Sequence, residues 1–320
     1  MEVTGKRYIV YSERDAVIRL TAISDVHLFN RGCSEDKLQA DINAVADNPY
    51  NYWLSLGDLC DWIGIGDKRF DPEAVAFFAT VRDLGNLGTV GRDTLVERFR
   101  PIHDRCLGVG VGNHELSYMR HQNQQRLIED MADMMGTWYL GYSSFTDVVM
   151  IYSPQSKGCP KLVRSLSDVP KGQDHFTVRV YTHHGHGYAR SQGGKMNKLV
   201  DFMRMSDADI TFCGHLHDQI IKTIVRLRSD PACNRIIAIP QIGVMTGSYL
   251  RTYAQGHIGY GEVKAYDPTP LGAVSVDVIP AHRRLTARVS IEPYNVEGID
   301  APDYEKWIEA AQRQEGENGK

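Results

Sequence analysis

Short apolar runs recur along the chain, and five of them stop at polar residues that can bind a metal or move a proton. The clearest run covers residues 52–56 and ends in the motif Gly-Asp-Leu-Cys-Asp at residues 57–61. Such a run is typical of a short buried strand, and in open α/β sheets ligand-binding residues collect just beyond the carboxyl ends of the strands. We therefore expect Asp58 to lie in a site, although Gly-Asp after a strand is also a common turn or helix cap.

The other four runs end in equally polar motifs. A strand expected over residues 17–23 leads to Asp25 and His27, and one over 208–213 leads to His215 and His217. The members of each pair are two positions apart, so in extended backbone both side chains of a pair would point to one side. The runs at 106–111 and 176–181 are followed by Asn113, His114 and Glu115 and by His183, His184 and His186, respectively.

The segments between the runs alternate helical and extended patterns. A helix-like pattern at 36–46 joins the first two strands into a βαβ unit, which predicts parallel strands with a right-handed crossover. Residues 62–104 form a largely helical excursion that could build one wall of a cleft or could simply supply packing helices. Within and after this excursion we expect helices at 72–83 and 92–99, one that follows the motif at 112–115 through about residue 135, and one at 196–205. We expect strands at 144–152, 220–227, 235–240, 261–266, 273–279 and 284–291.

The last residues differ from the rest because they are highly charged. A helix at 304–314 is expected to close the chain, inside a tail at 301–320 that frays at its end. No internal repeat or low-complexity tract interrupts the pattern before it. We therefore expect one domain over residues 1–300, followed by a C-terminal helix and tail over 301–320.

The composition narrows the class of protein. With 320 residues, 42 % hydrophobic and 24 % charged, the chain is typical of soluble globular proteins. A formal charge of −4 excludes a bulk attraction to nucleic acid or to anionic membranes. We expect a cytoplasmic protein, because the sequence shows neither a signal peptide nor a membrane span, and its six cysteines contain no CxxC pair.

The donor atoms in the five motifs indicate a metal centre. Seven of the 12 histidines lie in these motifs, together with carboxylates and one amide. A mixed set of nitrogen and oxygen donors suits Mn²⁺, Fe or Zn²⁺ better than Ca²⁺ or Mg²⁺. The donors are too many for one tetrahedral ion, so we expect two divalent transition-metal ions, with Mn²⁺ favoured, that share one carboxylate. Two such ions can clamp the attacking and leaving oxygens of a phosphoryl displacement.

Taken together, the order DVH, GDLCD, GNHE, HH and GHLH between residues 25 and 217 resembles the calcineurin-like metallophosphoesterase superfamily. The resemblance implies an α/β fold in which two mixed sheets, flanked by helices, form a four-layer αββα sandwich with the metals at the strand ends. The strand-rich segment after residue 217 is compatible with the second sheet.

The resemblance also implies roles for individual residues. Asp58 would be shared by both metals, and a histidine of the 183–184 pair would bind the second one. We favour His183 because it comes first after the strand, and His184 is the alternative. The full set of ligands that the family pattern implies is Asp25, His27, Asp58 and His217 for the first metal, and Asp58, Asn113, His215 and His183 or His184 for the second.

Catalysis in this family implies a nucleophile and a proton donor. A hydroxide that bridges the metals would attack phosphorus, since bound cations depress the pKa of water to about 7 in the best-known zinc case. His114 would stabilise or protonate the leaving oxygen, and Asp61 would orient that imidazole. Arg190 and Lys195, in a glycine-containing loop, are candidate phosphate-binding residues or simply solvated charges.

Two departures from the family pattern restrict the substrate. Trp62 and Ile63 follow the second Asp of the 57–61 motif, where the protein Ser/Thr phosphatases have Arg-Gly, so a protein phosphatase is not indicated. The double-strand-break nucleases usually replace that Asp by His, and this chain does not.

We therefore expect a metal-dependent phosphodiesterase acting on a nucleotide or nucleic acid. The alternatives are a phosphomonoesterase, a non-catalytic scaffold with a phosphoesterase fold, and a nucleic-acid-binding module, which would lack its usual basic stripe. The sequence leaves the oligomeric state open.

Overall fold

The computed structural model describes residues 1–168, 174–230, 234–254, 256 and 258–289. The tail expected at 301–320, the helix at 304–314 and the end of the strand expected at 284–291 lie outside these residues. None of the helices in the described part of the chain combines the length and the apolar character that a membrane span needs.

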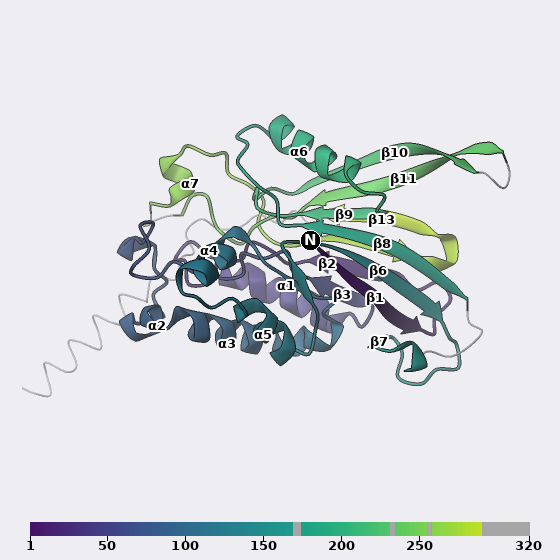
Figure 1. Cartoon of the computed structure of the whole chain (residues 1–320), viewed down its shortest axis with the longest axis horizontal. Helices are drawn as coiled ribbons and strands as arrows, with labels where there is room; N and C mark the ends of the chain where they lie inside the picture. Colours follow the sequence, from purple (N-terminus) through teal and green to yellow (C-terminus); the bar gives the residue numbers. More distant parts are fainter. Residues whose placement is uncertain (169–173, 231–233, 255, 257, 290–320) are drawn as a thin grey trace, which may run out of the picture.

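Seven strands form the larger sheet, in the order β10-β11-β9-β8-β6-β1-β7 (Figure 1). Neighbouring strands β8 and β9 are parallel, as are β9 and β11 and also β1 and β6, whereas the other pairs are antiparallel. The carboxyl ends of β8 and β9 therefore lie at the same edge. The strands are β1 Glu2–Tyr11, β6 Ser143–Tyr152, β7 Lys161–Val163, β8 His175–His183, β9 Ile210–Cys213, β10 Ile220–Asp230 and β11 Arg235–Met245.

Four strands form the smaller sheet, in the order β13-β12-β2-β3. Its strands β2 and β3 are parallel, so their carboxyl ends also meet. Beside β3 the chain continues the layer, since the Leu107 N–H donates to the Trp53 carbonyl at 2.7 Å. The strands are β2 Ile18–Ala22, β3 Asn51–Leu54, β12 Val274–Ile279 and β13 Arg284–Val289, and a separate parallel pair consists of β4 Val109–Gly110 and β5 Tyr139–Gly141.

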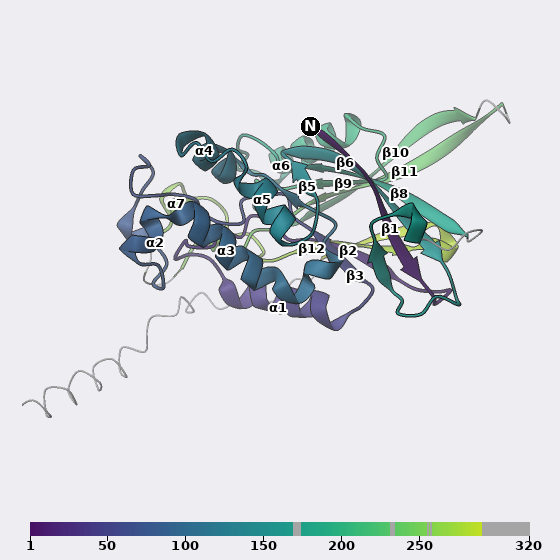
Figure 2. The ribbon, with the colours of Figure 1, turned by 60° about the horizontal axis from the view of Figure 1, so that its bottom comes forward.

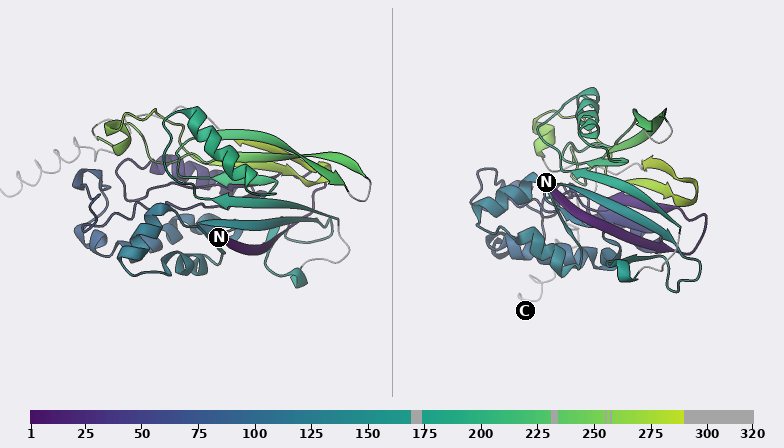
Figure 3. Two further views of the ribbon diagram at one scale, coloured as in Figure 1. Left: turned by 45° about the horizontal axis from the view of Figure 1, so that its top comes forward. Right: turned by 45° about the vertical axis from the view of Figure 1, so that its right-hand side comes forward.

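The two sheets pack face to face, and helices cover their outer faces (Figures 2 and 3). Buried residues of both sheets, such as Leu20, Val180 and Val276, form the apolar layer between them. Helix α6 (Gln192–Arg204) covers the larger sheet, with Phe202 buried in that contact. Helices α1 (Glu35–Asp47), α3 (Leu87–Phe99) and α5 (Leu127–Met134) cover the smaller sheet. The expected four-layer arrangement of mixed sheets flanked by helices is confirmed.

Short helical elements complete the described chain. They are the α-helices α2 Val81–Gly85, α4 Asn113–His121 and α7 Tyr260–Val263, and the 3-10 turns η1 Pro72–Ala74, η2 Arg100–Arg105, η3 Leu166–Asp168 and η4 Pro280–His282. In Figure 1 the hairpin of β10 and β11 extends beyond the rest of the larger sheet.

Some local expectations were wrong. The helix expected at 72–83 is only the turn η1 and the start of α2, which buries no residue and so has no apolar face to hold a longer helix together. The strand expected at 261–266 is instead α7 and a turn. Strand β1 was not expected, because its first half is polar and exposed, but β6 and β7 pair with it on both sides.

Candidate metal centre

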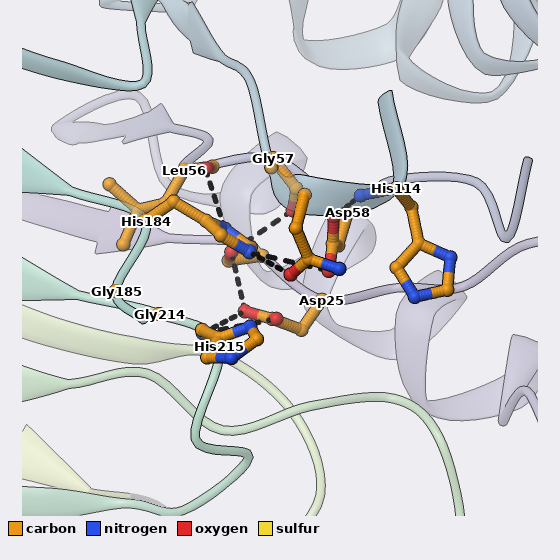
Figure 4. A network of polar contacts seen from close by, with 12 residues as sticks. Asp25, Leu56, Gly57, Asp58, His114, His184, Gly185, Gly214 and His215 are labelled. Atoms are coloured by element: carbon orange, nitrogen blue, oxygen red, sulfur yellow. Dashed lines mark hydrogen bonds and ion pairs between the residues drawn. The ribbon is translucent and has the colours of Figure 1, made fainter. Parts of the chain in front are cut away.

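The five motifs of the sequence meet at one end of the two sheets. The loop after β2 runs beside the loop after β3, since the Asp25 N–H donates to the Gly57 carbonyl and the His27 N–H to the Asp58 carbonyl, both at 3.0 Å. The loop after β9 joins them, because the His215 N–H donates to both carboxylate oxygens of Asp25 at 3.1 Å. Figure 4 shows the carboxylates and imidazoles converging, with the ring of His114 to one side.

Left-handed backbone recurs at this end of the sheets. The angle φ is +53° at Asp25 and at His27, +50° at Asp58, +72° at His215 and +48° at His217. For residues with a Cβ this conformation costs about 1–2 kcal/mol, and strain of this kind clusters at functional sites. Our expectation that the paired residues lie in extended backbone was therefore wrong. Sharp turns, and not the alternation of a strand, direct these side chains inward.

The first group of side chains consists of Asp25, His27 and His217, whose ligand atoms all lie within 4.8 Å of one another. The two Nε2 atoms of the histidines are 3.2 Å apart, and His217 Nε2 is 3.4 Å from Asp25 Oδ1. Asp25 and His27 are buried. The structure thus brings together three of the four ligands expected for the first metal.

The second group consists of Asp58, His184 and His215, again within 4.8 Å of one another. His184 Nε2 lies 3.3 Å from Asp58 Oδ2. The amide of Asn113 reaches the same place: its terminal atom is 3.2 Å from Asp58 Oδ2, 3.1 Å from His184 Nε2 and 2.7 Å from His215 Nδ1. If the atom at this position is the amide oxygen, it joins the Asp58 oxygen and the two imidazole nitrogens as a fourth acceptor, and a cation would stabilise the four together. If the amide is reversed, its NH₂ group donates hydrogen bonds to the same three atoms.

The outer nitrogen of three of these rings is fixed by an acceptor. His27 Nδ1 lies 3.1 Å from Asp61 Oδ1, His184 Nδ1 3.0 Å from the Leu56 carbonyl, and His215 Nε2 2.7 Å from the Gly187 carbonyl. A carbonyl or carboxylate oxygen can only accept, so the outer nitrogen of each ring carries a proton and the inner nitrogen faces the site, where a neutral ring offers its lone pair. Metal-binding histidines are held in this way by their outer partners.

The charges of the site favour a cation. Burial disfavours the ionised carboxyls of Asp25 and Asp58, yet the neighbouring imidazoles hold the pKa of both below the ordinary value. Burial also disfavours a charged His184, but Asp58 and Asp25 raise its pKa to about 9. Asp58 interacts with His27 of the first group as well as with His184 of the second. The negative charge of the buried carboxylates therefore favours a cation in each of the two groups, between which Asp58 lies.

His183, the residue that we favoured over His184, lies outside both groups. Its Nδ1 accepts the Gly185 N–H at 2.8 Å, and its ring packs on Phe202 of α6 with centroids 4.3 Å apart. His184 follows β8 and turns to the opposite side, into the second group. The geometry therefore favours His184 over the expected His183.

Asp61 lies between two rings. Its carboxylate hydrogen-bonds to His27 at 3.1 Å and accepts from Asn30 Nδ2 at 3.1 Å, while His114 Nδ1 is 3.6 Å from it. The closer contact of His114 Nδ1 is the backbone carbonyl of Asp61, at 2.5 Å. The side chain of Asp61 therefore supports His27 more directly than the His114 ring that it was expected to orient.

Glu115 is a residue whose role sequence reasoning missed. Its buried carboxylate accepts the N–H groups of Asp58 and Leu59 at 2.8 Å, that of Gly112 at 2.9 Å and the indole N–H of Trp62 at 3.1 Å. Burial and the nearby Asp58 carboxylate raise the pKa of Glu115 to about 7, although the backbone N–H of Asp58 and the charge of His184 oppose that rise. An acid three residues after a glycine that begins a helix is the sequence signal of such a role, because it can cap that helix.

A cavity of about 780 Å³ opens onto the candidate metal-binding side chains. Residues of the excursion, among them Ile63, Arg69 and Leu84, line one part of it. Arg190 and Lys195 also line it, as expected for substrate contacts, but Lys195 Nζ is 3.1 Å from Asp218 Oδ2 and is already neutralised. The volume suits a small organic ligand.

Comparison with known proteins identifies the family of the chain. A model of the family described as calcineurin-like phosphoesterase matches residues 18–219, a span that contains all five motifs. A search of curated proteins finds no match.

Solved structures resemble the chain only loosely. A conserved uncharacterized protein from Streptococcus pneumoniae TIGR4, described as a predicted phosphoesterase, has a TM-score of 0.29 and 11 % identity over 85 % of this chain and 99 % of its own. A single mutant of Vps29 from Entamoeba histolytica has a TM-score of 0.29 and 11 % identity over 86 % of this chain and 100 % of its own.

Proposed function

Since the chain belongs to the calcineurin-like phosphoesterase family, we propose that it is a dinuclear metal-dependent phosphodiesterase that acts on small, nucleotide-sized esters. The observation that carries the proposal is the fixed outer nitrogen of His27, His184 and His215, which leaves the three inner ring nitrogens facing buried carboxylates. Acceptor atoms that face one another repel when nothing lies between them, whereas a bound cation makes the same arrangement favourable.

The donor set fits two transition-metal ions. Asp25, His27 and His217 would hold one, and Asn113, His184 and His215 the other, with Asp58 shared between them. Mixed imidazole and oxygen donors suit Mn²⁺, which we favour, as well as Fe or Zn²⁺. When bound, two such ions supply Lewis acidity toward the phosphate and lower the pKa of water at the site.

The protein itself supplies proton transfer through His114. Its Nδ1–H donates to the Asp61 carbonyl, so Nε2 is the atom that can give a proton to the leaving oxygen. Burial disfavours the imidazolium, but Asp58 and Asp61 outweigh burial and raise the pKa of His114. The raised pKa favours the ring that is protonated at Nε2, the form that an acid catalyst requires.

The cavity supports a small substrate over a protein or a duplex nucleic acid. Much of its wall is apolar, with Phe29, Phe70 and Leu216 among its residues, which suits an aromatic or aliphatic group on the ester. The nearby Arg69 is held by Asp67, with Nη2 2.7 Å from Oδ2, so it offers little for the extra charge of a monoester.

The test compares bis(p-nitrophenyl) phosphate with p-nitrophenyl phosphate, using protein loaded with Mn²⁺, Fe²⁺ or Zn²⁺. We expect the diester to be preferred at least 10-fold in kcat/KM, and Asp58→Ala to reduce its hydrolysis more than 100-fold. Asp36→Ala, an exposed position of α1, is the matched control with unchanged activity.

The other outcomes identify the alternatives. Preference for the monoester would indicate a phosphomonoesterase. Hydrolysis of neither ester by metal-loaded protein would indicate a scaffold with a phosphoesterase fold.

A further inference from the structure

Arg251 is a buried cation on the wall of the cavity, outside the residues that the family model matches. Only 8 % of its surface is exposed. Of its guanidinium nitrogens, Nη1 donates to the Cys33 carbonyl at 3.3 Å, and Nε is buried without an acceptor. Among the residues that the structure describes, no carboxylate pairs with it.

The other Arg and Lys side chains that line the cavity are satisfied in ordinary ways. Arg69 is paired with Asp67, and Lys195 with Asp218. Arg190 is exposed and can be hydrated. Arg251 is therefore the cavity cation that is both largely buried and without a carboxylate partner in the described part of the chain.

Backbone contacts fix Arg251 close to the metal centre. The Tyr249 N–H donates to the Asp25 carbonyl at 3.0 Å, and the Arg251 N–H to the Gly32 carbonyl at 3.0 Å. Two residues of chain span at most about 7 Å, so the backbone of Arg251 lies within about 7 Å of Tyr249, which contacts the candidate metal ligand Asp25. This separation is comparable to the size of one nucleotide. Arg251 and the candidate metal-binding residues line the same cavity.

A buried charge without a partner is unfavourable unless a ligand compensates it. An arginine fork matches the oxygens of a phosphate group, and the interaction strengthens in a cavity shielded from water. We propose that Arg251 binds a second phosphate of the substrate, so that the enzyme prefers phosphodiesters carrying a further phosphate group. This inference rests on the proposed phosphodiesterase function and specifies its substrate class.

Matched chromogenic substrates test it. Thymidine 5′-(p-nitrophenyl phosphate) has one phosphate, and its 3′-phosphorylated form adds the second. We expect at least 10-fold higher kcat/KM for the 3′-phosphorylated form in the unmodified protein. Arg251→Gln should abolish this preference while leaving the substrate without the 3′-phosphate within about 2-fold, and Arg251→Lys should restore part of it.

Controls separate binding from folding. Arg204→Gln, at an exposed position in the last turn of α6, should retain the full preference. The melting temperature of ligand-free Arg251→Gln should equal or exceed that of the unmodified protein, because the change removes an uncompensated charge. A purely structural arginine would give a lower melting temperature and equal losses on both substrates, and that result would overturn the proposal.

A binding measurement is independent of catalysis. In chelator-treated protein, thymidine 3′,5′-bisphosphate should raise the melting temperature, and Arg251→Gln should lose this shift. If neither ester is hydrolysed but the shift depends on Arg251, the proposed function fails and the phosphate site stands. If the esters are hydrolysed without a preference for the second phosphate, the inference about Arg251 is wrong and the proposed phosphodiesterase function stands.

Discussion

The carboxylate of Asp61 hydrogen-bonds to the outer nitrogen of the His27 ring, with 3.1 Å between Oδ1 and Nδ1. His27 Nε2, on the inner side of the same ring, faces His217 and the buried Asp25. A carboxylate in this position orients a metal-binding imidazole and increases its basicity. Asp61 therefore acts on the candidate metal centre through His27, in addition to its backbone contact with His114.

Because the Asp61 carboxylate contacts His27, the substitution Asp61→Asn should affect metal binding and not only the orientation of His114. The neutral amide is a weaker acceptor for the His27 N–H, so we expect metal affinity to fall about 10- to 100-fold. Competition with a chromogenic chelator measures it, with the exposed Asp36→Asn as the control. Unchanged metal affinity with reduced turnover would return Asp61 to the role of orienting His114.

The choice between His184 and His183 predicts opposite results for two similar variants. His184→Gln should lower the metal content from about two ions to about one and reduce diester hydrolysis more than 100-fold, because a ligand of the second group is lost. His183→Gln should keep both ions, since its ring packs on Phe202. Elemental analysis of both purified variants decides the matter; metal loss in His183→Gln alone would reverse the assignment.

Gly112 must lack a side chain because Asp58 occupies the space beside it. A Cβ there would lie 2.0 Å from Asp58 Oδ1. We expect Gly112→Ala to displace the Asp58 carboxylate and to lower metal binding and activity together by at least 10-fold. Gly66→Ala is the matched control, since a Cβ at that residue meets nothing within 4 Å. Normal metal binding by Gly112→Ala would show that Asp58 is not needed in its observed position.

Glu115→Gln tests the buried acid that holds the loop around Asp58. The carboxylate now accepts hydrogen bonds from four N–H groups, and the NH₂ group of the glutamine would face some of these donors without being able to accept. We therefore expect a loss of about 3 kcal/mol in the free energy of unfolding. Urea denaturation in the presence of a chelator measures this loss without the contribution of metal. Glu262→Gln, at an exposed position of α7, should stay within about 0.5 kcal/mol of the unmodified protein. An equally small change in Glu115→Gln would contradict the inferred role.

Metal itself should stabilise the fold. Ions that bind only the folded state, at 100 times their dissociation constant, add about 2.7 kcal/mol to the free energy of unfolding. We therefore expect a chelator to lower the melting temperature, and Mn²⁺ to restore it. A melting temperature that does not respond to either addition would argue against a metal centre built from these side chains.

The sequence by itself indicated the layers of the fold, through the family resemblance, and named most of the residues that meet at the candidate site. Apolar runs that stop at Asp, Asn and His define strand ends locally, and parallel strands must bring those ends to one edge. The motif order between residues 25 and 217 then indicated the family. Strand ends and motifs are set by residues close together in the chain, so the pattern of residue types is enough to indicate them.

Only the tertiary structure decided which of two adjacent histidines turns toward Asp58, and which ring the carboxylate of Asp61 supports. His183 and His184 have the same chemistry and differ only in the direction that the end of β8 gives them. Arg251 carried no local signal, since its burial comes from contacts with the distant Gly32 and Cys33. Orientation, burial and unsatisfied charge arise between segments remote in sequence, and for that physical reason residue types and spacing alone did not reveal them.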